Sequence, residues 1–202
     1  LDEKRKEKLA ISCSVRQDRI ISAPDVESIY DVPLNFEKDN LGDALLDALH
    51  LPKDTKASFD EWRNFVERYH ASAKEISIGI VGKYFDTGDY VLSDAYLSVI
   101  EALKFSAAEI GVKAKIDWIN AKDFQEGSGL EKLSNYHGIL VPGGFGESGI
   151  EGKIHAIRYA RENKIPYFGL CYGMQLAVIE YARNVLGLTG AHTVEINPAT
   201  EH

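Results

Sequence analysis

The pattern of apolar and polar positions becomes regular from Glu75 onward. Apolar runs at 76–81, 112–119, 138–141 and 165–170 predict strands, and apolar residues at helical spacing predict helices over 96–110, 154–160 and 174–186. A further short helix is expected after the loop at 127–129. Nearly continuous apolar strands are typical of a parallel sheet that helices cover on both faces. The pattern therefore predicts an open, doubly wound, mostly parallel α/β sheet, with ligand sites at the carboxyl ends of its strands.

The first 74 residues are less regular. Apolar stretches at Leu9–Val15 and Arg19–Ser22 predict two strands, and Cys13 in the first of them is expected to be buried. Helical spacing follows at 41–49 and again at 59–69. Pro52, Lys53 and Asp54 separate these two helices, so we divide the chain into part of one domain (1–52), a linker with a helix (53–74) and a second domain (75–202).

Composition and charge exclude several classes of protein. With 45% hydrophobic and 27% charged residues, the 202-residue chain can bury a core. A net charge of −8 and the absence of a basic stripe argue against a nucleic-acid partner. No apolar run reaches the roughly 18 residues of a membrane span, and two cysteines favour a reducing, cytoplasmic setting. The chain starts with Leu1 rather than Met, which suggests a piece of a longer protein.

The first candidate for chemistry is the motif Gly169-Leu170-Cys171-Tyr172-Gly173, between a predicted strand and a predicted helix. This G-x-C-x-G has the layout of a nucleophile elbow, in which a sharp turn projects the thiol of Cys171 into a cleft. Backbone N–H groups of the following helix favour the thiolate, and the N–H of Tyr172 can stabilise an oxyanion. The competing interpretation is a structural cysteine buried at a tight turn.

The second candidate is the glycine loop Pro142-Gly143-Gly144-Phe145-Gly146, which follows the neighbouring predicted strand. In a parallel sheet this loop reaches the same edge as Cys171, so the N–H of Gly144 could be a second oxyanion donor. A phosphate-binding loop is a weaker interpretation, because the Lys-Ser or Lys-Thr that should follow is missing. A plain tight turn is the third.

These motifs resemble the class I glutamine amidotransferase domain of the CTP synthase family, which has a flavodoxin-like fold. The similar segments are Val81–Tyr84, Ser93–Leu103, Pro142–Gly146, Gly149–Lys153, Tyr159–Pro166 and Gly169–Gln175. Lys8–Cys13 and Asp25–Tyr30 are similar to the end of the family's synthetase (amidoligase) domain, itself an α/β domain. The resemblance therefore extends over essentially the whole chain.

The resemblance implies a ligase that aminates UTP to CTP, using ATP, Mg²⁺ and ammonia released from glutamine, with GTP as activator and a homotetramer as the assembly. It implies that Cys171 is the glutaminase nucleophile. Gly144, Tyr172, Gly173, Met174 and Gln175 would hold glutamine and the oxyanion, and Glu195 would meet the polar end of glutamine. Lys8 would contact a nucleotide and the pair Asp25 and Val26 its adenine. No metal ligand is implied in this chain.

Two departures from the family pattern affect this interpretation. Tyr172 stands where the family has Leu, which we expect to change the pocket wall but to keep the backbone donor. A His-x-Glu or His-x-Asp pair, which would supply the general base, is absent from the 202 residues, and His137, His155 and His192 are the substitutes to consider. We therefore expect an incomplete copy of the domain, inactive by itself. A glutamine-binding or regulatory module without turnover, and another cysteine hydrolase such as a γ-glutamyl peptidase, remain alternatives.

Overall fold

The computed structural model describes residues 1–53, 58–83, 96–144 and 146–202. They separate into two compact units, Leu1–Ala71 and Ser72–His202. None of the described helices is long and apolar enough to cross a membrane. Tyr84, Ser93–Ala95 and Phe145 of the family-like segments, and Asp54 of the predicted linker, lie outside the described residues. The division into 1–52, 53–74 and 75–202 stays a prediction.

The first unit is helical in its described part. It comprises α1 (Glu3–Cys13), the 3-10 helix η1 (Gln17–Arg19), α2 (Asp31–Lys38), α3 (Leu41–Leu49) and α4 (Asp60–Ala71). The helices predicted over 41–49 and 59–69 are confirmed as α3 and α4. The structure of residues 9–22 differs from the prediction.

The two strands predicted at Leu9–Val15 and Arg19–Ser22 are wrong. Residues up to Cys13 continue α1, which begins where the Asp2 carboxylate accepts a hydrogen bond from the Arg5 N–H at 2.8 Å. Such an N-cap satisfies a backbone donor that a helix end otherwise leaves without a partner. Cys13 is exposed, so the expected burial of its thiol is also wrong.

Helix α4 packs within this first unit. The Trp62 indole N–H donates to the Tyr30 carbonyl at 3.0 Å, and the rings of Trp62, Phe65 and Tyr69 meet Tyr30 edge-on. His70 pairs with the carboxylate of Asp31 at 3.0 Å. Side chains from one face of α4 therefore tie it to the start of α2.

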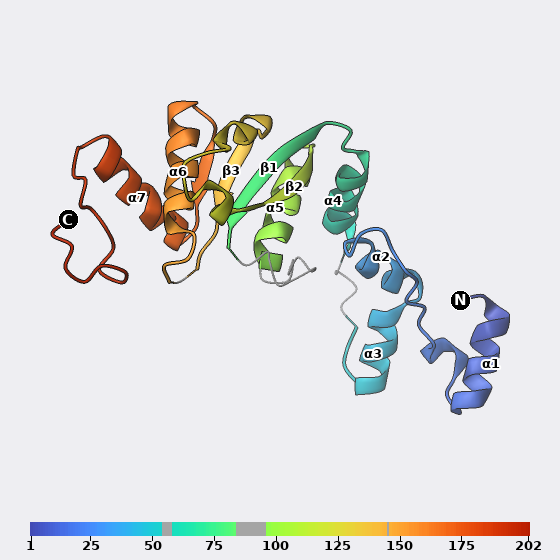
Figure 1. The fold of residues 1–202 in the computed structure, drawn as a ribbon. Coiled ribbons are helices and arrows are strands. Elements are labelled where there is room, and N and C mark those ends of the chain that lie inside the picture. The colour runs from blue at the N-terminus through green and yellow to red at the C-terminus, as the bar shows by residue number, and fades with distance from the viewer. Residues whose placement is uncertain (54–57, 84–95, 145) are drawn as a thin grey trace. The chain divides into compact units, whose positions relative to one another are not determined.

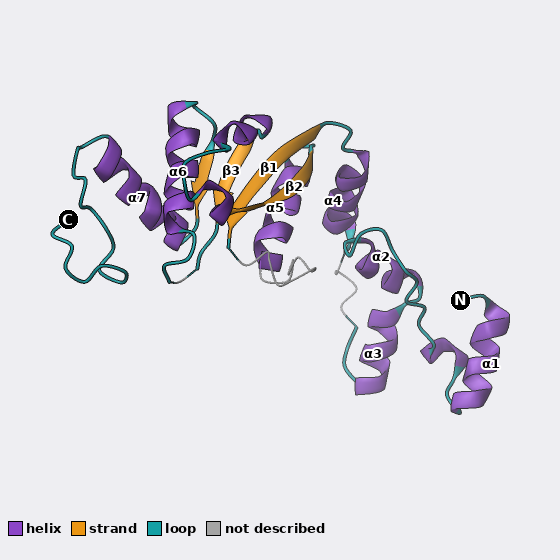
Figure 2. Ribbon diagram, viewed as in Figure 1, coloured by secondary structure: helices purple, strands orange, loops and turns teal. Residues whose placement is uncertain are grey.

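The second unit contains a parallel sheet of β1 (Glu75–Gly82), β2 (Lys113–Asn120), β3 (Gly138–Val141) and β4 (Tyr167–Gly169). The strand order is β2-β1-β3-β4, and every pair is parallel (Figures 1 and 2). This confirms the predicted parallel, doubly wound sheet, although β4 is shorter than the apolar run at 165–170. Chain order reverses between β1 and β3, which is the switch point where ligand sites form in such sheets.

Helices connect these strands, and all of them except η3 lie where the sequence pattern predicts a helix. They are α5 (Leu97–Glu109), the 3-10 helices η3 (Ala121–Phe124) and η4 (Leu130–Asn135), α6 (Ile150–Glu162) and α7 (Tyr172–Asn184). The short helix expected after 127–129 is η4. Gly111, which follows the last turn of α5, has φ +72°, a conformation that glycine adopts without strain.

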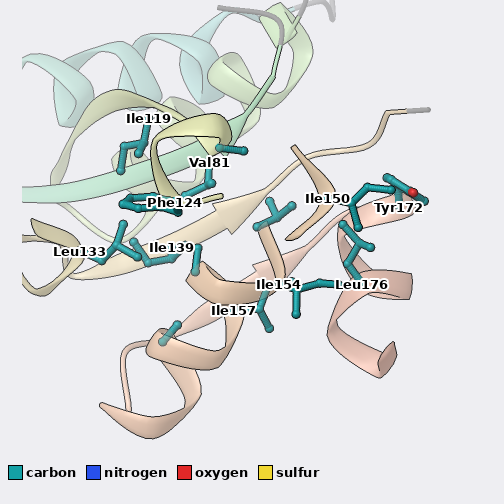
Figure 3. Close-up of a cluster of buried hydrophobic side chains, with 14 of the residues drawn as sticks. Val81, Ile119, Phe124, Leu133, Ile139, Ile150, Ile154, Ile157, Tyr172 and Leu176 are labelled. Carbon is teal, nitrogen blue, oxygen red and sulfur yellow. The ribbon is translucent and has the colours of Figure 1, made fainter. Parts of the chain in front are cut away.

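Buried side chains lie on both faces of the sheet because neighbouring residues of a strand point in opposite directions. Val81 and Val141 belong to a cluster with residues of η3, η4, α6 and α7 (Figure 3). Ile80 and Leu140, one position away, pack with residues of α5 on the other face. Because β3 and β4 are parallel, their carboxyl ends lie at the same edge of the sheet, where the connections to α6 and α7 begin.

Candidate active site

Cys171 lies in the turn between β4 and α7 and is exposed. Its backbone angles, φ 50° and ψ −106°, fall outside the regions that residues other than glycine prefer. Strain of this kind persists only where the surrounding structure enforces it, and it is concentrated at functional sites. The turn therefore has the geometry of the predicted nucleophile elbow, and the interpretation of Cys171 as a buried structural cysteine is wrong.

Both glycines of the motif are required by close backbone contacts. A Cβ on Gly169 would lie 2.6 Å from the Gly173 carbonyl carbon, and a Cβ on Gly173 would lie 2.0 Å from the Val141 carbonyl oxygen. A side chain at position 169 would push the strand end of the elbow away from the first turn of α7. A side chain at position 173 would push α7 away from β3. The glycines thus allow the first turn of α7 to sit directly against the sheet.

Hydrogen bonds fix the same turn. The Leu170 N–H donates to the Val141 carbonyl at 2.9 Å, and the Gly173 N–H donates to the Leu170 carbonyl at 2.9 Å. The Tyr167 hydroxyl donates to the Gly173 carbonyl at 2.7 Å, and burial raises the pKa of Tyr167 well above its usual value. The Tyr167 hydroxyl therefore remains a protonated donor.

The glycine loop lies against the elbow. A Cβ on Gly143 would be 3.5 Å from the Cys171 Cβ, which confirms that the loop after β3 and the cysteine share one edge of the sheet. The Tyr96 hydroxyl donates to the Gly143 carbonyl at 3.4 Å. Gly144, the predicted oxyanion donor, is the next residue and is half-buried. Its role as a donor stays a prediction.

Tyr172 is buried in the core, so the expectation that its side chain forms a pocket wall is wrong. Figure 3 shows its ring beside Ile150 at the start of α6. Within the described part of the chain, its buried hydroxyl has no hydrogen-bond partner. Burial raises the pKa of Tyr172, and the negative charges of Glu195 and Glu147 raise it further.

The predicted glutamine-binding residues differ in their surroundings. Gly173 is buried, with its N–H and carbonyl both bonded within the fold, whereas Met174 and Gln175 are exposed on the first turn of α7. Glu195 is exposed in the segment after α7, and its charge reaches Tyr172. The structure thus brings Gly143, and with it the neighbouring Gly144, beside Cys171, whereas Glu195 acts on this turn only through its charge on Tyr172. The binding roles themselves stay predictions.

The three substitute histidines are engaged elsewhere. His137 precedes β3, and its Nδ1 accepts from the Ser77 N–H at 3.0 Å, at the opposite end of that strand from the glycine loop. The His155 Nδ1 lies 2.8 Å from the Phe124 carbonyl, and the His192 Nδ1 accepts from the Thr193 N–H at 2.9 Å. Within the described ranges, the hydrogen bonds of these three rings are to groups other than Cys171.

The predicted nucleotide-contacting residues lie in the first unit. Lys8 is exposed on α1, Asp25 is exposed between η1 and α2, and Val26 next to it is half-buried. A pocket of about 510 Å³ in the same unit is lined by other residues, among them Lys6 and Asp39, which form an ion pair at 2.8 Å. The nucleotide roles of Lys8, Asp25 and Val26 stay predictions.

Sequence reasoning missed Lys153, a lysine buried beside the elbow. Lysine on an amphipathic helix is expected at the surface, so it attracted no notice. The available signal was its spacing, because Lys153 falls on the same helical stripe as Ile150, Ile154 and Ile157.

Comparison with known proteins agrees with this geometry. Residues 91–200 match the family glutamine amidotransferase class-I, and residues 1–51 match the CTP synthase N-terminus. A glutaminase domain of Trypanosoma brucei CTPS with bound acivicin is 37% identical and superimposes with a TM-score of 0.57, over 63% of this chain and 48% of that one.

Proteins named CTP synthase are similar over the whole chain. The protein of Methanocaldococcus jannaschii is 47% identical over 208 residues, covering 100% of this chain and 37% of the relative. That of Listeria innocua is 45% identical over 202 residues, again covering 100% and 37%. The chain thus spans little more than a third of the length of these relatives. It belongs to the class I glutamine amidotransferases and, among them, to the CTP synthase family.

Proposed function

We propose that this chain supplies the glutamine-hydrolysing nucleophile of a CTP synthase. The Cys171 thiolate attacks the carboxamide carbon of glutamine, and the N–H groups of Tyr172 and Gly144 stabilise the oxyanion that forms. The C–N bond then breaks as the leaving nitrogen takes up a proton, ammonia departs, and glutamate remains bound to Cys171 as a thioester. Water hydrolyses the thioester to glutamate. The observation that carries the proposal is the strained, exposed Cys171 at the start of α7, against the glycine loop.

The proton transfers need a separate acid and base. Neither the thiol nor the backbone donors can protonate the leaving ammonia or activate water, and a general acid–base group typically contributes about 10²–10⁴ in rate. His137, His155 and His192 are held by other partners within the described residues. The 202-residue chain by itself is therefore expected to form the covalent adduct without sustained turnover.

The activity of the whole protein rests on family membership. We propose amination of UTP to CTP with ATP, Mg²⁺ and GTP, in a cytoplasmic homotetramer, with Lys8, Asp25 and Val26 touching nucleotide. The residues present do not fit a Mg²⁺ site, because no group of three acidic, histidine or cysteine side chains comes together among the described residues.

Labelling with 6-diazo-5-oxo-norleucine, a reactive glutamine analogue, tests the nucleophile. Peptide mass mapping should find the adduct on Cys171, with glutamine protecting it. Cys13 is also exposed and serves as an internal control, so selectivity for Cys171 would have to come from recognition of the analogue rather than from access. Equal labelling of both cysteines, or labelling that glutamine does not slow, would contradict the proposal.

A glutamine-binding module without turnover is the second candidate, because His137, His155 and His192 are bonded to groups other than Cys171 within the described residues. Calorimetry on Cys171→Ala and labelling of the unsubstituted chain together distinguish the two candidates. Such a module would bind glutamine in the calorimeter, yet the analogue would leave Cys171 of the unsubstituted chain unlabelled. A γ-glutamyl peptidase would not account for the match of residues 1–51 to the CTP synthase N-terminus.

A further inference from the structure

The peptide bond between Gly143 and Gly144 holds the predicted oxyanion donor, the Gly144 N–H. It joins two glycines, and without a Cβ on either side steric contacts do little to fix the direction in which the peptide faces. The Gly143 carbonyl and the Gly144 N–H belong to the same peptide plane. The orientation of this one peptide therefore decides whether the donor is available to a substrate.

The Tyr96 hydroxyl contacts this peptide directly. It donates to the Gly143 carbonyl at 3.4 Å, which is long for an O–H···O hydrogen bond, so the bond is a weak one. The peptide is trans, as are all peptide bonds in the described ranges, and its N–H therefore points in the direction opposite to its carbonyl. With the carbonyl turned toward Tyr96, the Gly144 N–H is turned away from it.

Packing holds the ring that carries this hydroxyl. Tyr96 immediately precedes α5, is 8% exposed, and forms a buried cluster with Ile80 of β1 and Leu140 of β3. Leu170, the residue before Cys171, packs against the same cluster. The sheet and the start of the elbow therefore set the position from which the hydroxyl reaches the glycine loop.

The same peptide lies beside the nucleophile. A Cβ on Gly143 would stand 3.5 Å from the Cys171 Cβ, so the glycine loop and the elbow are in van der Waals contact at this residue. Tyr96 packs on the face of the sheet that α5 covers, whereas Tyr172, at the start of α7, is buried on the other face. A Gly144 N–H that points away from Tyr96 therefore points toward the face on which α7 packs.

We propose, on the basis of the proposed glutaminase function, that Tyr96 is a positioning residue, whose hydroxyl holds the Gly143–Gly144 peptide so that the Gly144 N–H is available to the oxyanion formed at Cys171. Without this hydrogen bond the peptide rotates more freely, and a rotated peptide presents a carbonyl oxygen in place of the donor. That oxygen would repel the oxyanion. Because Tyr96 does not touch the reacting atoms, its effect is confined to steps in which an oxyanion develops.

Two reagents separate oxyanion stabilisation from the reactivity of the thiol. The Cys171 thiolate attacks the carbonyl carbon of 4-nitrophenyl acetate through a tetrahedral oxyanion, the C–O bond breaks, 4-nitrophenolate leaves, and an acetyl thioester remains. Iodoacetamide alkylates the same thiolate with loss of iodide, and no oxyanion forms. Both rates are measured at one fixed pH on the full chain carrying Cys13→Ser, in which Cys171 is the only thiol, and Cys171→Ala gives the background.

Tyr96→Phe removes the hydroxyl and keeps the ring that packs on the sheet. It should slow acylation by 4-nitrophenyl acetate about threefold to fivefold, the effect of losing one weak neutral hydrogen bond, and leave the iodoacetamide rate unchanged. Tyr136→Phe is the matched control, because it removes another half-buried hydroxyl, beside the Asp117 carboxylate, just before β3 and thus at the opposite end of that strand from the glycine loop. It should leave both rates unchanged.

Three results would overturn the proposal. The first is an acylation rate of Tyr96→Phe equal to that of the parent. The second is an equal loss in both rates, which would mean that the whole elbow is disturbed. The third is a Tyr96→Phe chain that thermal unfolding shows to be unfolded at the assay temperature, because the hydroxyl would then serve the fold rather than one donor.

4-Nitrophenyl acetate needs no glutamine site, so this test and the test of the proposed function fail separately. If the norleucine analogue does not label Cys171 while Tyr96→Phe still slows acylation alone, the glutaminase is refuted and the positioning role of Tyr96 remains. If the analogue labels Cys171 with protection by glutamine while Tyr96→Phe is acylated like the parent, the positioning role is refuted and the glutaminase remains.

Discussion

The tightest contact of the elbow is between Gly173 and β3, and Gly173→Ala tests it directly. The new methyl group would lie 2.0 Å from the Val141 carbonyl oxygen and 2.8 Å from its carbonyl carbon. An ordinary C···O contact is about 3.3 Å, so α7 and β3 must separate by roughly 1.3 Å. Both obstructing atoms belong to the backbone of Val141, the last residue of the interior strand β3, and neither can rotate away.

Three contributions decide the size of the effect. Overpacking of a closely packed interior costs about 1–3 kcal/mol. The separation also loosens the bonds from the Gly173 N–H to Leu170 and from the Tyr167 hydroxyl to Gly173, each of which contributes about 0.5–1.5 kcal/mol. Alanine's higher helix propensity offsets about 1 kcal/mol. The free energy of unfolding should therefore fall by about 3 kcal/mol.

Urea unfolding monitored by the fluorescence of Trp118 in β2 measures this change in the second unit, with Trp62→Phe as a common background so that one tryptophan reports. Gly190→Ala is the matched control, since a Cβ there meets nothing within 4 Å, and it should change stability by less than about 0.5 kcal/mol. If Gly173→Ala were as stable as Gly190→Ala, the close packing of the elbow on β3 would be refuted.

Three further predictions follow from neighbouring contacts. Tyr172→Phe should stabilise the fold by about 1–3 kcal/mol in chemical denaturation, because it removes a buried hydroxyl without a described partner, and a loss of stability would mean that the hydroxyl is bonded. Arg161→Met should lower the free energy of unfolding by about 2–3 kcal/mol, because it leaves the buried Glu180 carboxylate without its cation. Arg158→Met breaks an exposed ion pair and should lower it by less than about 0.5 kcal/mol. Similar losses for both variants would contradict this reasoning. Stability should rise between pH 7.5 and 9.5, because Lys153, with a pKa of about 8 when folded and 10.5 when unfolded, binds more protons in the unfolded state. The gain in this window is about 2 kcal/mol, and Lys153→Met should lose it.

The sequence alone determined the second unit and the place of its site. Apolar runs long enough to be buried on both faces and helical stripes between them predict β1 to β4 and α5 to α7 because each period admits one secondary structure. Since parallel strands end at one edge, the sequence also placed Cys171 and the glycine loop side by side, which the contact of Gly143 with Cys171 confirms.

Local patterns failed where two signals compete. The apolar residues at 9–15 resemble a strand, but they lie in a helix that Asp2 caps and that extends through Cys13. The capping residue lies seven positions before this apolar stretch, so the apolar pattern alone does not reveal the helix. The same reasoning error assigned burial to Cys13.

Only the tertiary structure decided which way Tyr172 points and why Lys153 is buried. The elbow turns the side chain of Tyr172 into the core. The close approach of Gly152 to Ala121 fixes the rotation of α6 that places the Lys153 ammonium over the Tyr172 ring. Both outcomes depend on how two helices distant in the sequence pack against one sheet. The free energy of a charge depends on what surrounds it in space, and a one-dimensional pattern does not contain that information.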